Sequence, residues 1–301
     1  SSIIELHDVE RGGGGIALID SAALVGGCVI FDNTVVANDD DIPQDGAGIY
    51  SEDSLLLVDS TLIHDNLASY TGGGIFAEGT CESCSLTRIT RSSITDNMCF
   101  AGGGGIYSYG NARTEVINTL IAENHGYYSG GMSSSYGSSA LIQNCTIAYN
   151  TGVYTDLNLV GGIRCTSGSA EVSNTILWGN KGLQMKAIDA ESSLAASYCN
   201  VQMPDANGVN DTDAVWQGEG NINKDPLFAR FSHLNSSVQY FLKSTEGRWD
   251  PETMTYVQDA VTSPCIDAGD PASVYFMEPE PNGNRINLGA WGGTDGASLS
   301  P

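Results

Sequence analysis

Aromatic and acidic side chains recur at two fixed positions after a repeated Gly-Gly-Ile step. The set lies one and three residues after this step and comprises Tyr50, Glu52, Phe76, Glu78, Tyr107 and Tyr109. Residues two apart on a strand point to the same face, so we expect one strip of rings bordered by carboxylates. Flat rings beside hydrogen-bond acceptors can stack on sugars, which makes the strip a candidate glycan-binding site. Stacking between neighbouring strands is the simpler explanation of the same spacing, and it needs no ligand.

Two acidic loops offer the oxygen ligands that Ca²⁺ prefers. The first covers residues 38–45 and contains three consecutive Asp residues; a solvated turn is the favoured interpretation there. The second alternates acids and amides around a Gly turn, and its candidate ligands are Asp205, Asn207, Asn210, Asp211 and Asp213. For this second loop a Ca²⁺ site and a solvated turn are equal alternatives. Ca²⁺ is the one cofactor that the sequence suggests.

The eight cysteines divide into a loop pair and a set of isolated residues. Cys81 and Cys84 form a CxxC step in the longest loop of their repeat, and no second CxxC or His pair follows to complete a metal site. We expect a disulfide between them that closes the loop, with Cys99 as a competing partner. Cys145 and Cys199 would lie two coils apart, about 10 Å, which is beyond the reach of a bridge. They are more typical of small buried side chains.

The elements that must position these residues are short repeats. Gly-Gly-Ile or a close variant ends at Ile16, Ile49, Ile75, Ile106, Met132 and Ile163. An aliphatic-x-x-Asn step follows each one and ends at Asn33, Asn66, Asn97, Asn124, Asn150 and Asn180. Successive asparagines are therefore 33, 31, 27, 26 and 30 residues apart. A period in this range indicates stacked structural units.

Each repeat contains short β-branched runs between Gly, Ser, Asn and Asp, with no capped helical period. Three strands of about 4–6 residues fit one repeat. We therefore predict an all-β fold, a right-handed parallel β-helix of about seven coils. Inside it, the Ile column alternates with a column of small residues, which fills a narrow interior. The asparagines mark a turn, because Asn tolerates the left-handed conformation and stacked amides can hydrogen-bond along the axis.

The paired steps resemble the right-handed parallel β-helix repeats of the polymorphic outer-membrane-protein type, whose signature joins Gly-Gly-x-Ile to Phe-x-x-Asn. Ile or Leu stands here where that family has Phe, and the resemblance covers roughly residues 12–203. Residues 218–228, 263–270 and 285–293 look like the C-terminal end of large secreted bacterial β-helix surface proteins. The resemblance implies a secreted or surface-exposed bacterial protein.

The period stops after residue 203, which divides the chain into repeats at 1–203 and a C-terminal capping region at 204–301. The second part contains Trp216, Trp249 and Trp291. The end of a β-helix exposes unpaired strand edges, so we expect this region to cover it. The N-terminal end shows no equivalent cap. We expect it to be covered by a preceding segment, the chain being processed or part of something longer, or by a neighbouring subunit in a head-to-tail contact.

The residue sets of known β-helix enzymes are absent as sets. Asp39-Asp40-Asp41 supplies an acid pair, but neither the Gly-His-Gly nor the Arg-Ile-Lys step of pectin hydrolases follows. His64 and His125 are candidate bases, yet cations on the repeats are few and no cluster converges by spacing. We name no catalytic residue and leave catalysis open, leaning against it. The alternative function is a polysaccharide lyase or hydrolase of β-helix type.

Charge limits the partners. Lys and Arg total 12 against 36 acids, a net charge of −24, which argues against nucleic acid. No apolar stretch is long enough to cross a membrane. The best prediction from sequence is a non-catalytic extracellular or cell-surface module that acts in adhesion, in a surface fibre or in glycan binding. Its expected partners are a glycan or a neighbouring subunit, the latter through the N-terminal end.

Overall fold

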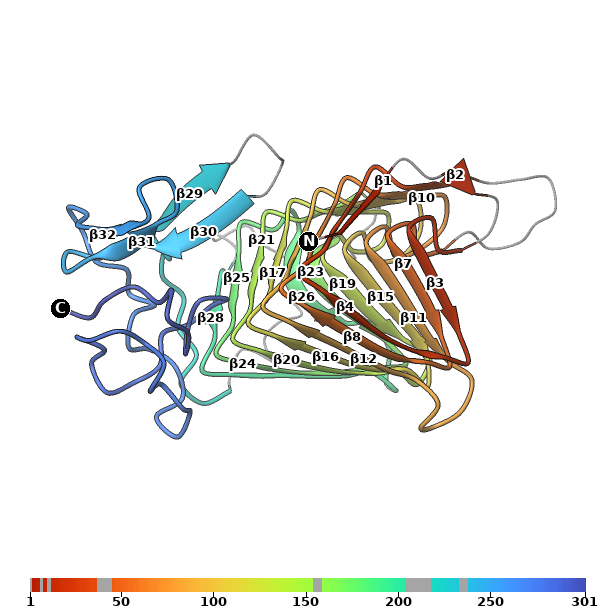
Figure 1. The fold of residues 1–301 in the computed structure, drawn as a ribbon. Helices are drawn as coiled ribbons and strands as arrows, with labels where there is room; N and C mark the ends of the chain where they lie inside the picture. The colour runs from red at the N-terminus through yellow and green to blue at the C-terminus, as the bar shows by residue number, and fades with distance from the viewer. Residues whose placement is uncertain are drawn as a thin grey trace.

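The computed structural model consists of strands and turns (Figure 1). It describes residues 2–5, 8–9, 12–36, 45–153, 159–203, 218–232 and 238–301. These residues contain no helix, and hence none that could span a membrane.

Four parallel sheets run along one axis. Sheet A stacks β1 (Ile3–Glu5), β5 (Val29–Phe31), β9 (Leu62–His64), β13 (Ser93–Thr95), β17 (Leu120–Ala122), β21 (Thr146–Ala148), β25 (Ile176–Trp178) and β28 (Asn200–Val201). Sheet B stacks β2 (Asp8–Val9), β6 (Thr34–Val35), β10 (Leu67–Ala68), β14 (Met98–Cys99), β18 (His125–Gly126) and β22 (Thr151–Gly152). Sheet C stacks β3 (Ile16–Ile19), β7 (Ile49–Glu52), β11 (Ile75–Gly79), β15 (Ile106–Gly110), β19 (Met132–Ser135), β23 (Val160–Thr166) and β26 (Leu183–Ala187). Sheet D stacks β4 (Ala22–Gly26), β8 (Leu55–Asp59), β12 (Leu86–Thr90), β16 (Arg113–Ile117), β20 (Ser139–Gln143), β24 (Ser169–Ser173) and β27 (Ser193–Ser197).

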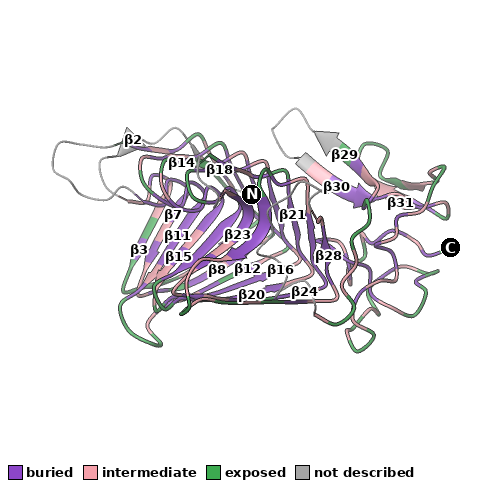
Figure 2. Ribbon diagram, turned by 180° about the vertical axis from the view of Figure 1, so that it is seen from behind, coloured by how far each residue is buried: buried purple, intermediate pink, exposed green. Residues whose placement is uncertain are grey.

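Each coil passes through sheets C, D, A and B in turn, so every strand pairs with the strand one coil away. The predicted parallel β-helix is thereby confirmed. The inward Ile column is in register, since Ile75 pairs with both Ile49 and Ile106, and all three are fully buried. Figure 2 shows buried residues concentrated on the strands of the β-helix. Large side chains therefore fill the interior coil by coil.

The asparagines form a buried ladder. Each side-chain amide donates to the side-chain oxygen of the next asparagine at 2.9–3.0 Å, through Asn33, Asn66, Asn97, Asn124, Asn150 and Asn180. The expectation that Asn itself is left-handed is off by one residue. The positive φ belongs to the preceding residue, for example 52° at Asp65 and 55° at Asp96. That turn aims the Asn amide into the interior, where only another buried polar group can satisfy it.

Beyond the repeats, the chain first extends sheet A and then packs on its outside. Ile222 forms a parallel bridge with Asn200 of β28. Two antiparallel hairpins follow: β29 (Phe228–Ser232) with β30 (Val238–Leu242), and β31 (Arg248–Asp250) with β32 (Thr255–Val257). Arg230 on β29 donates to both carboxylate oxygens of Glu123, at 2.8 and 3.0 Å. The first hairpin is thus held against the turns that follow sheet A.

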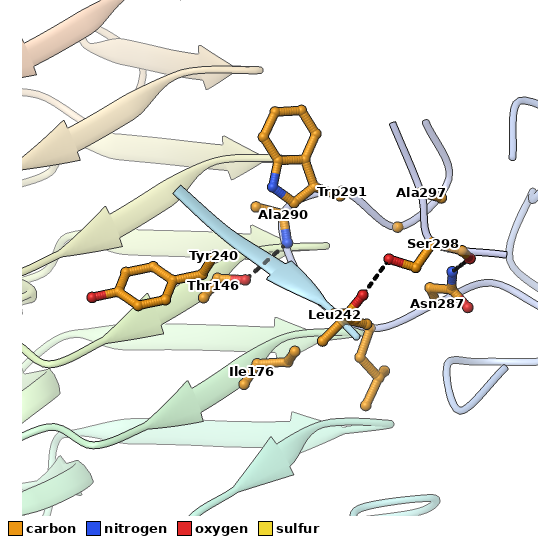
Figure 3. Close-up of a pocket in the computed structure, with 11 residues that line it drawn as sticks. Thr146, Ile176, Tyr240, Leu242, Asn287, Ala290, Trp291, Ala297 and Ser298 are labelled. Carbon is orange, nitrogen blue, oxygen red and sulfur yellow. Dashed lines mark hydrogen bonds between the residues drawn. The ribbon is translucent and has the colours of Figure 1, made fainter. Parts of the chain in front are cut away.

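A close-packed seam joins the C-terminal residues to sheet A (Figure 3). The backbone N–H of Ala290 donates to the hydroxyl of Thr146 at 3.0 Å, and Trp291 stacks on Phe241 with ring centroids 4.6 Å apart. The remaining space beside Ile176 is about 10 Å³, enough for no more than one water. The seam is therefore a packing interface, too small to hold a ligand.

Candidate functional site

An open cleft of about 560 Å³ lies over the outer face of sheet C. Strands β11, β15, β19 and β23 supply its floor, and the turns that lead from sheet B into sheet C supply its wall. The lining residues are Asp45, Tyr70, Thr71, Phe76, Glu78, Ala101, Gly102, Tyr107, Tyr109, Tyr128, Ser135, Tyr136, Arg164 and Thr166. At Gly102 a side chain is excluded, because a Cβ atom would collide with the ring of Tyr107. That glycine lets the wall approach the floor closely.

The predicted aromatic strip exists as a stacked ladder. Phe76 pairs in register with Tyr50 and Tyr107, and the ring centroids are 5.3 and 5.8 Å apart with nearly parallel planes. Phe76 is only 4% exposed, because its neighbours cover both faces of its ring. Within the ladder, neighbouring rings therefore cover each other's faces. This stacking stabilises the sheet and leaves no ring face free for a sugar.

Four of the six residues predicted to bind a glycan line the cleft, and the other two lie outside it on sheet C. Phe76, Glu78, Tyr107 and Tyr109 line the cleft. Tyr50 and Glu52 lie one coil further along, where the Tyr50 hydroxyl donates to the Glu52 carboxylate at 2.9 Å. Burial raises the pKa of Tyr107 to about 12, so its phenol is neutral at physiological pH.

Three accessible rings around the cleft were not anticipated from sequence. Tyr70, Tyr128 and Tyr136 are 52%, 38% and 59% exposed. Tyr70 and Tyr128 each follow a ladder asparagine by four residues (70 − 66 and 128 − 124), and this regularity was available in the sequence. Tyr136 lies in the left-handed turn after β19 and tilts against Tyr109 at 5.2 Å. These rings, unlike Phe76, have surface that a ligand can reach.

Carboxyl groups occupy the end of the cleft nearer the N-terminal coils. Asp45 is almost fully buried and accepts hydrogen bonds from the backbone N–H of Thr71 at 2.9 Å and from the Thr71 hydroxyl. Burial raises the pKa of Asp45 to about 6. Burial, and then the nearby charges of Glu52 and Asp53, also raise the pKa of Glu78. A carboxyl group held partly protonated near neutral pH can act as an acid in catalysis.

A single cation occupies the other end. Arg164 on β23 is the one Lys or Arg among the lining residues, and its guanidinium carbon lies 4.9 Å from the centroid of the Tyr128 ring. That distance is typical of a cation–π contact. Burial lowers the pKa of Arg164. The cleft thus carries acids at one end, tyrosines along its length and one arginine at the other end.

The two histidines considered as bases lie away from this cleft. His64 is buried, stacks on Phe31 at 5.0 Å and places its Nδ1 2.7 Å from a carboxylate oxygen of Asp65. His125 is exposed on β18 and does not line the cleft.

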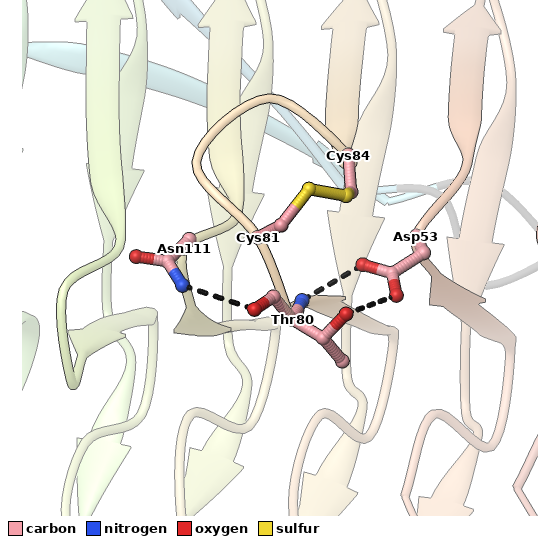
Figure 4. Close-up of a disulfide and its surroundings, with 5 residues drawn as sticks. All are labelled: Asp53, Thr80, Cys81, Cys84 and Asn111. Atoms are coloured by element: carbon pink, nitrogen blue, oxygen red, sulfur yellow. Dashed lines mark hydrogen bonds between the residues drawn. A yellow bond between two sulfur atoms is a disulfide. The ribbon is translucent and has the colours of Figure 1, made fainter.

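The structure joins Cys81 and Cys84 by a disulfide in the loop between β11 and β12, with Cα atoms 5.3 Å apart (Figure 4). Next to the bridge, the backbone N–H of Thr80 donates to Asp53 at 2.7 Å. Cys99, the competing partner, is a buried free thiol. The loop is thereby closed on itself beside sheet C.

The candidate Ca²⁺ ligands from Asp205 to Asp213, and most of the loop at 38–45, lie outside the described residues. Within the described ranges, no group of three or more His, Cys, Asp or Glu residues is placed to hold a metal ion. The Ca²⁺ hypothesis therefore stays a prediction from sequence.

Comparisons with known families agree with this architecture. Residues 15–210 match a family model described as a right-handed β-helix region. Residues 197–269 match a second model described as disaggregatase related. No curated protein and no solved structure matches the chain. The first model spans about two-thirds of the sequence and coincides with the stacked coils, and on this ground the chain belongs to the right-handed β-helix family.

Proposed function

We propose that this protein is a non-catalytic extracellular or cell-surface β-helix module whose sheet C cleft binds a glycan. The proposal extends to a surface protein of the polymorphic outer-membrane-protein type, for which the Gly-Gly-Ile and aliphatic-x-x-Asn steps are the support.

The observation that carries the proposal is the set of accessible tyrosines around a cleft of about 560 Å³. Tyr70 and Tyr128 stand on the wall, and Tyr136 stands at the end of a floor strand. Tyrosine combines a flat apolar face with a hydroxyl, which suits a sugar ring that has one apolar face and a polar edge. The cleft is long and open, and this shape suits a chain ligand better than an enclosed small molecule.

The test measures glycan binding by the purified protein and by single variants. Screening on a glycan array identifies ligands, and calorimetry then compares the parent with Tyr70→Ala and Tyr136→Ala. An aromatic contact contributes about 1 kcal/mol, so each variant should bind roughly fivefold more weakly. Phe276→Ala is the matched control, because Phe276 is an exposed ring outside the cleft. Equal loss in all three variants, or no glycan bound by the parent, would contradict the proposal.

Catalysis in the same cleft is the second candidate. Its support is Asp45, whose buried carboxyl has a pKa of about 6, together with Glu78 on the neighbouring floor. A pair of carboxyl groups flanking a bound sugar is the arrangement that glycoside hydrolysis uses. Incubating bound polysaccharides with the parent and with Asp45→Asn, and measuring new reducing ends and unsaturated products, decides between the two. Product formed by the parent and not by Asp45→Asn would replace the binding module with an enzyme.

Self-association is a further part of the proposal. Strands β1, β3 and β4 end their sheets and pair on one side only among the described residues, which leaves backbone groups open to another strand. A second copy joined head to tail through this end would build a surface fibre. Sedimentation over a range of concentrations, with negative-stain microscopy, tests it; a monomer at all concentrations would remove the fibre from the proposal.

A further inference from the structure

Hydrogen-bond donors gather at the Arg164 end of the cleft. Arg164 and Thr166 lie two residues apart on β23, and Ser135 on β19 pairs in register with Thr166. All three line the cleft. Residues two apart on one strand share a face, so these side chains form one patch on the floor.

Of these three polar groups, the Arg164 guanidinium is the accessible one, because Arg164 is only partly buried. The hydroxyl oxygens of Ser135 and Thr166 are buried, and the Ser135 hydroxyl interacts with the Tyr107 phenol. Within the described residues no carboxylate forms an ion pair with Arg164, and its guanidinium lies over the Tyr128 ring. Buried polar groups are almost always paired in native proteins, and an unpaired one costs stability. A partly buried guanidinium with no carboxylate partner among the described residues therefore indicates a missing partner that accepts hydrogen bonds.

The charges around the cleft define what that partner is. The pKa of Arg164 is lowered because burial disfavours its charged form, and an anion bound beside it would reverse this. At the opposite end, Asp45 and Glu78 would repel an anion. The guanidinium fork matches a planar carboxylate with two parallel hydrogen bonds. One arginine in a chain of net charge −24 suits a single carboxylate better than a densely sulfated polymer, which needs clustered cations.

We propose that Arg164 binds the carboxylate of a uronic acid in the sheet C cleft. This rests on the glycan-binding function proposed above and narrows the ligand to an acidic polysaccharide. Arg164 is the specificity-determining residue, since it distinguishes a uronic acid from the corresponding neutral sugar.

The coil spacing sets how much of the ligand contacts the cleft. Glu78 and Thr166 are separated by three register steps, through Tyr109 and Ser135. At about 4.8 Å a step, the two ends of the floor lie about 14 Å apart. A ligand that fills the cleft is therefore an oligosaccharide, with its uronic acid at the Arg164 end and neutral units beside the acids.

The experiment compares matched pairs of oligosaccharides by calorimetry with the intact protein. Each pair is an oligosaccharide of neutral units with a single uronic acid at one end, and the same oligosaccharide with that carboxyl reduced to an alcohol. A charge-assisted bidentate contact should make the acidic member bind roughly tenfold or more tightly than its neutral counterpart. Arg164→Gln should abolish this difference while leaving the neutral member unchanged. Arg164→Lys, which keeps the charge and loses the fork, should restore part of it.

Two controls keep a loss of binding from being mistaken for a loss of structure. Arg91→Gln removes an exposed arginine that pairs with Asp59 at 2.6 Å away from the cleft, and it should bind both members like the parent. Ser135→Ala and Thr166→Val each remove one buried hydroxyl beside Arg164 that a ligand does not reach, and both variants should keep the parent's preference for the acidic member.

The outcomes separate this inference from the function on which it rests. If neutral members bind as tightly as acidic ones, or Arg164→Gln leaves the preference intact, the uronic-acid assignment is wrong and the glycan-binding function stands. Binding confined to sulfated glycans would likewise overturn the carboxylate assignment. Binding of no oligosaccharide of any kind would overturn both.

Discussion

The asparagine ladder should be a major source of stability, and Asn124→Ala tests it at the centre of the repeats. The Asn124 side chain makes four hydrogen bonds inside the β-helix. Its amide donates to the backbone oxygen of Ile94 at 2.9 Å and to the Asn150 side chain at 3.0 Å. Its oxygen accepts from both the backbone N–H and the amide of Asn97 at 3.0 Å. Asn124 is fully buried, so water cannot replace these bonds.

The expected loss in the free energy of unfolding depends on which groups keep another hydrogen-bond partner in the variant. The Asn97 amide still donates to the backbone oxygen of Ile63, and the Asn150 oxygen still accepts from the backbone N–H of Asn124. The backbone N–H of Asn97 loses its side-chain acceptor, and the backbone oxygen of Ile94 loses the Asn124 amide as a donor. An orphaned buried donor costs about 1–3 kcal/mol and each of the three other lost bonds about 1 kcal/mol, which gives a total of about 4–6 kcal/mol.

The assay is urea unfolding followed by circular dichroism, on the parent, Asn124→Ala and Asn111→Ala. Asn111 is an exposed loop residue with one long side-chain hydrogen bond, 3.5 Å to the Thr80 oxygen. Its substitution should change the free energy of unfolding by less than about 0.5 kcal/mol. The slope against urea should be similar in all three proteins, because the buried surface is nearly the same. If Asn124→Ala lies within about 1 kcal/mol of Asn111→Ala, the ladder contributes far less than a buried network should.

Three further predictions concern folding, pH and metal. Ile106→Asp places an unpaired carboxylate in the fully buried Ile column and should prevent folding at ambient temperature; a melting temperature within a few degrees of the parent would show that Ile106 does not face the core. Burial raises the pKa of Asp45 from 3.8 to about 6, so the folded state favours its protonated form. The stabilisation that this group gives to the folded protein is therefore full below pH 3.8 and is lost as the pH rises through 6. Melting curves across this window should therefore show a steeper fall for the parent than for Asp45→Asn, and parallel curves would refute the burial argument. If the loop from Asp205 to Asp213 binds Ca²⁺, millimolar Ca²⁺ should raise the melting temperature relative to EDTA. The Asp211→Ala variant should not show this increase. Equal melting temperatures of the parent in both buffers would contradict the Ca²⁺ hypothesis.

The interior of the β-helix was readable from sequence because one side chain per coil repeats there. Ile49, Ile75 and Ile106 recur at a fixed place after a glycine pair, and stacking puts them in register. The asparagine ladder was also expected, since its spacing follows the same period. What failed was the local detail at the turn: the left-handed residue is Asp65 and not Asn66, because the Asn must direct its amide inward. Turn conformation depends on side-chain partners that a period alone does not reveal.

The cleft was only half predictable. Its floor follows from the repeat, so Tyr107 and Tyr109 were placed correctly on the outer face of sheet C. The accessible rings were missed because they stand on turns, and the height of a turn over the floor is set by its own packing. The approach of the wall at Gly102 is an example, since it depends on contact with the Tyr107 ring. Arg164 is one of the few cations on the repeats, and the sequence did not single it out, because its position in the cleft beside the Tyr128 ring is a property of the folded chain.

The inward and outward side chains of the same strands have different roles: the inward ones pack the core, and the outward ones form the surface of the cleft. On β19 and β23 the inward Met132 and Ile163 preserve the apolar column, while the outward neighbours change from the aromatic residues of earlier coils to Ser133 and Arg164. A substitution inward leaves a cavity or a buried charge and threatens the fold. A substitution outward leaves this core intact and alters what the cleft presents, although Phe76 in the stacked ladder is itself buried. The chemistry along sheet C can therefore change from acid to aromatic to cation, coil by coil, on a scaffold that does not change. This independence is what the proposed glycan binding requires of the scaffold: a repeat with one fixed core that presents different side chains to the successive units of a ligand.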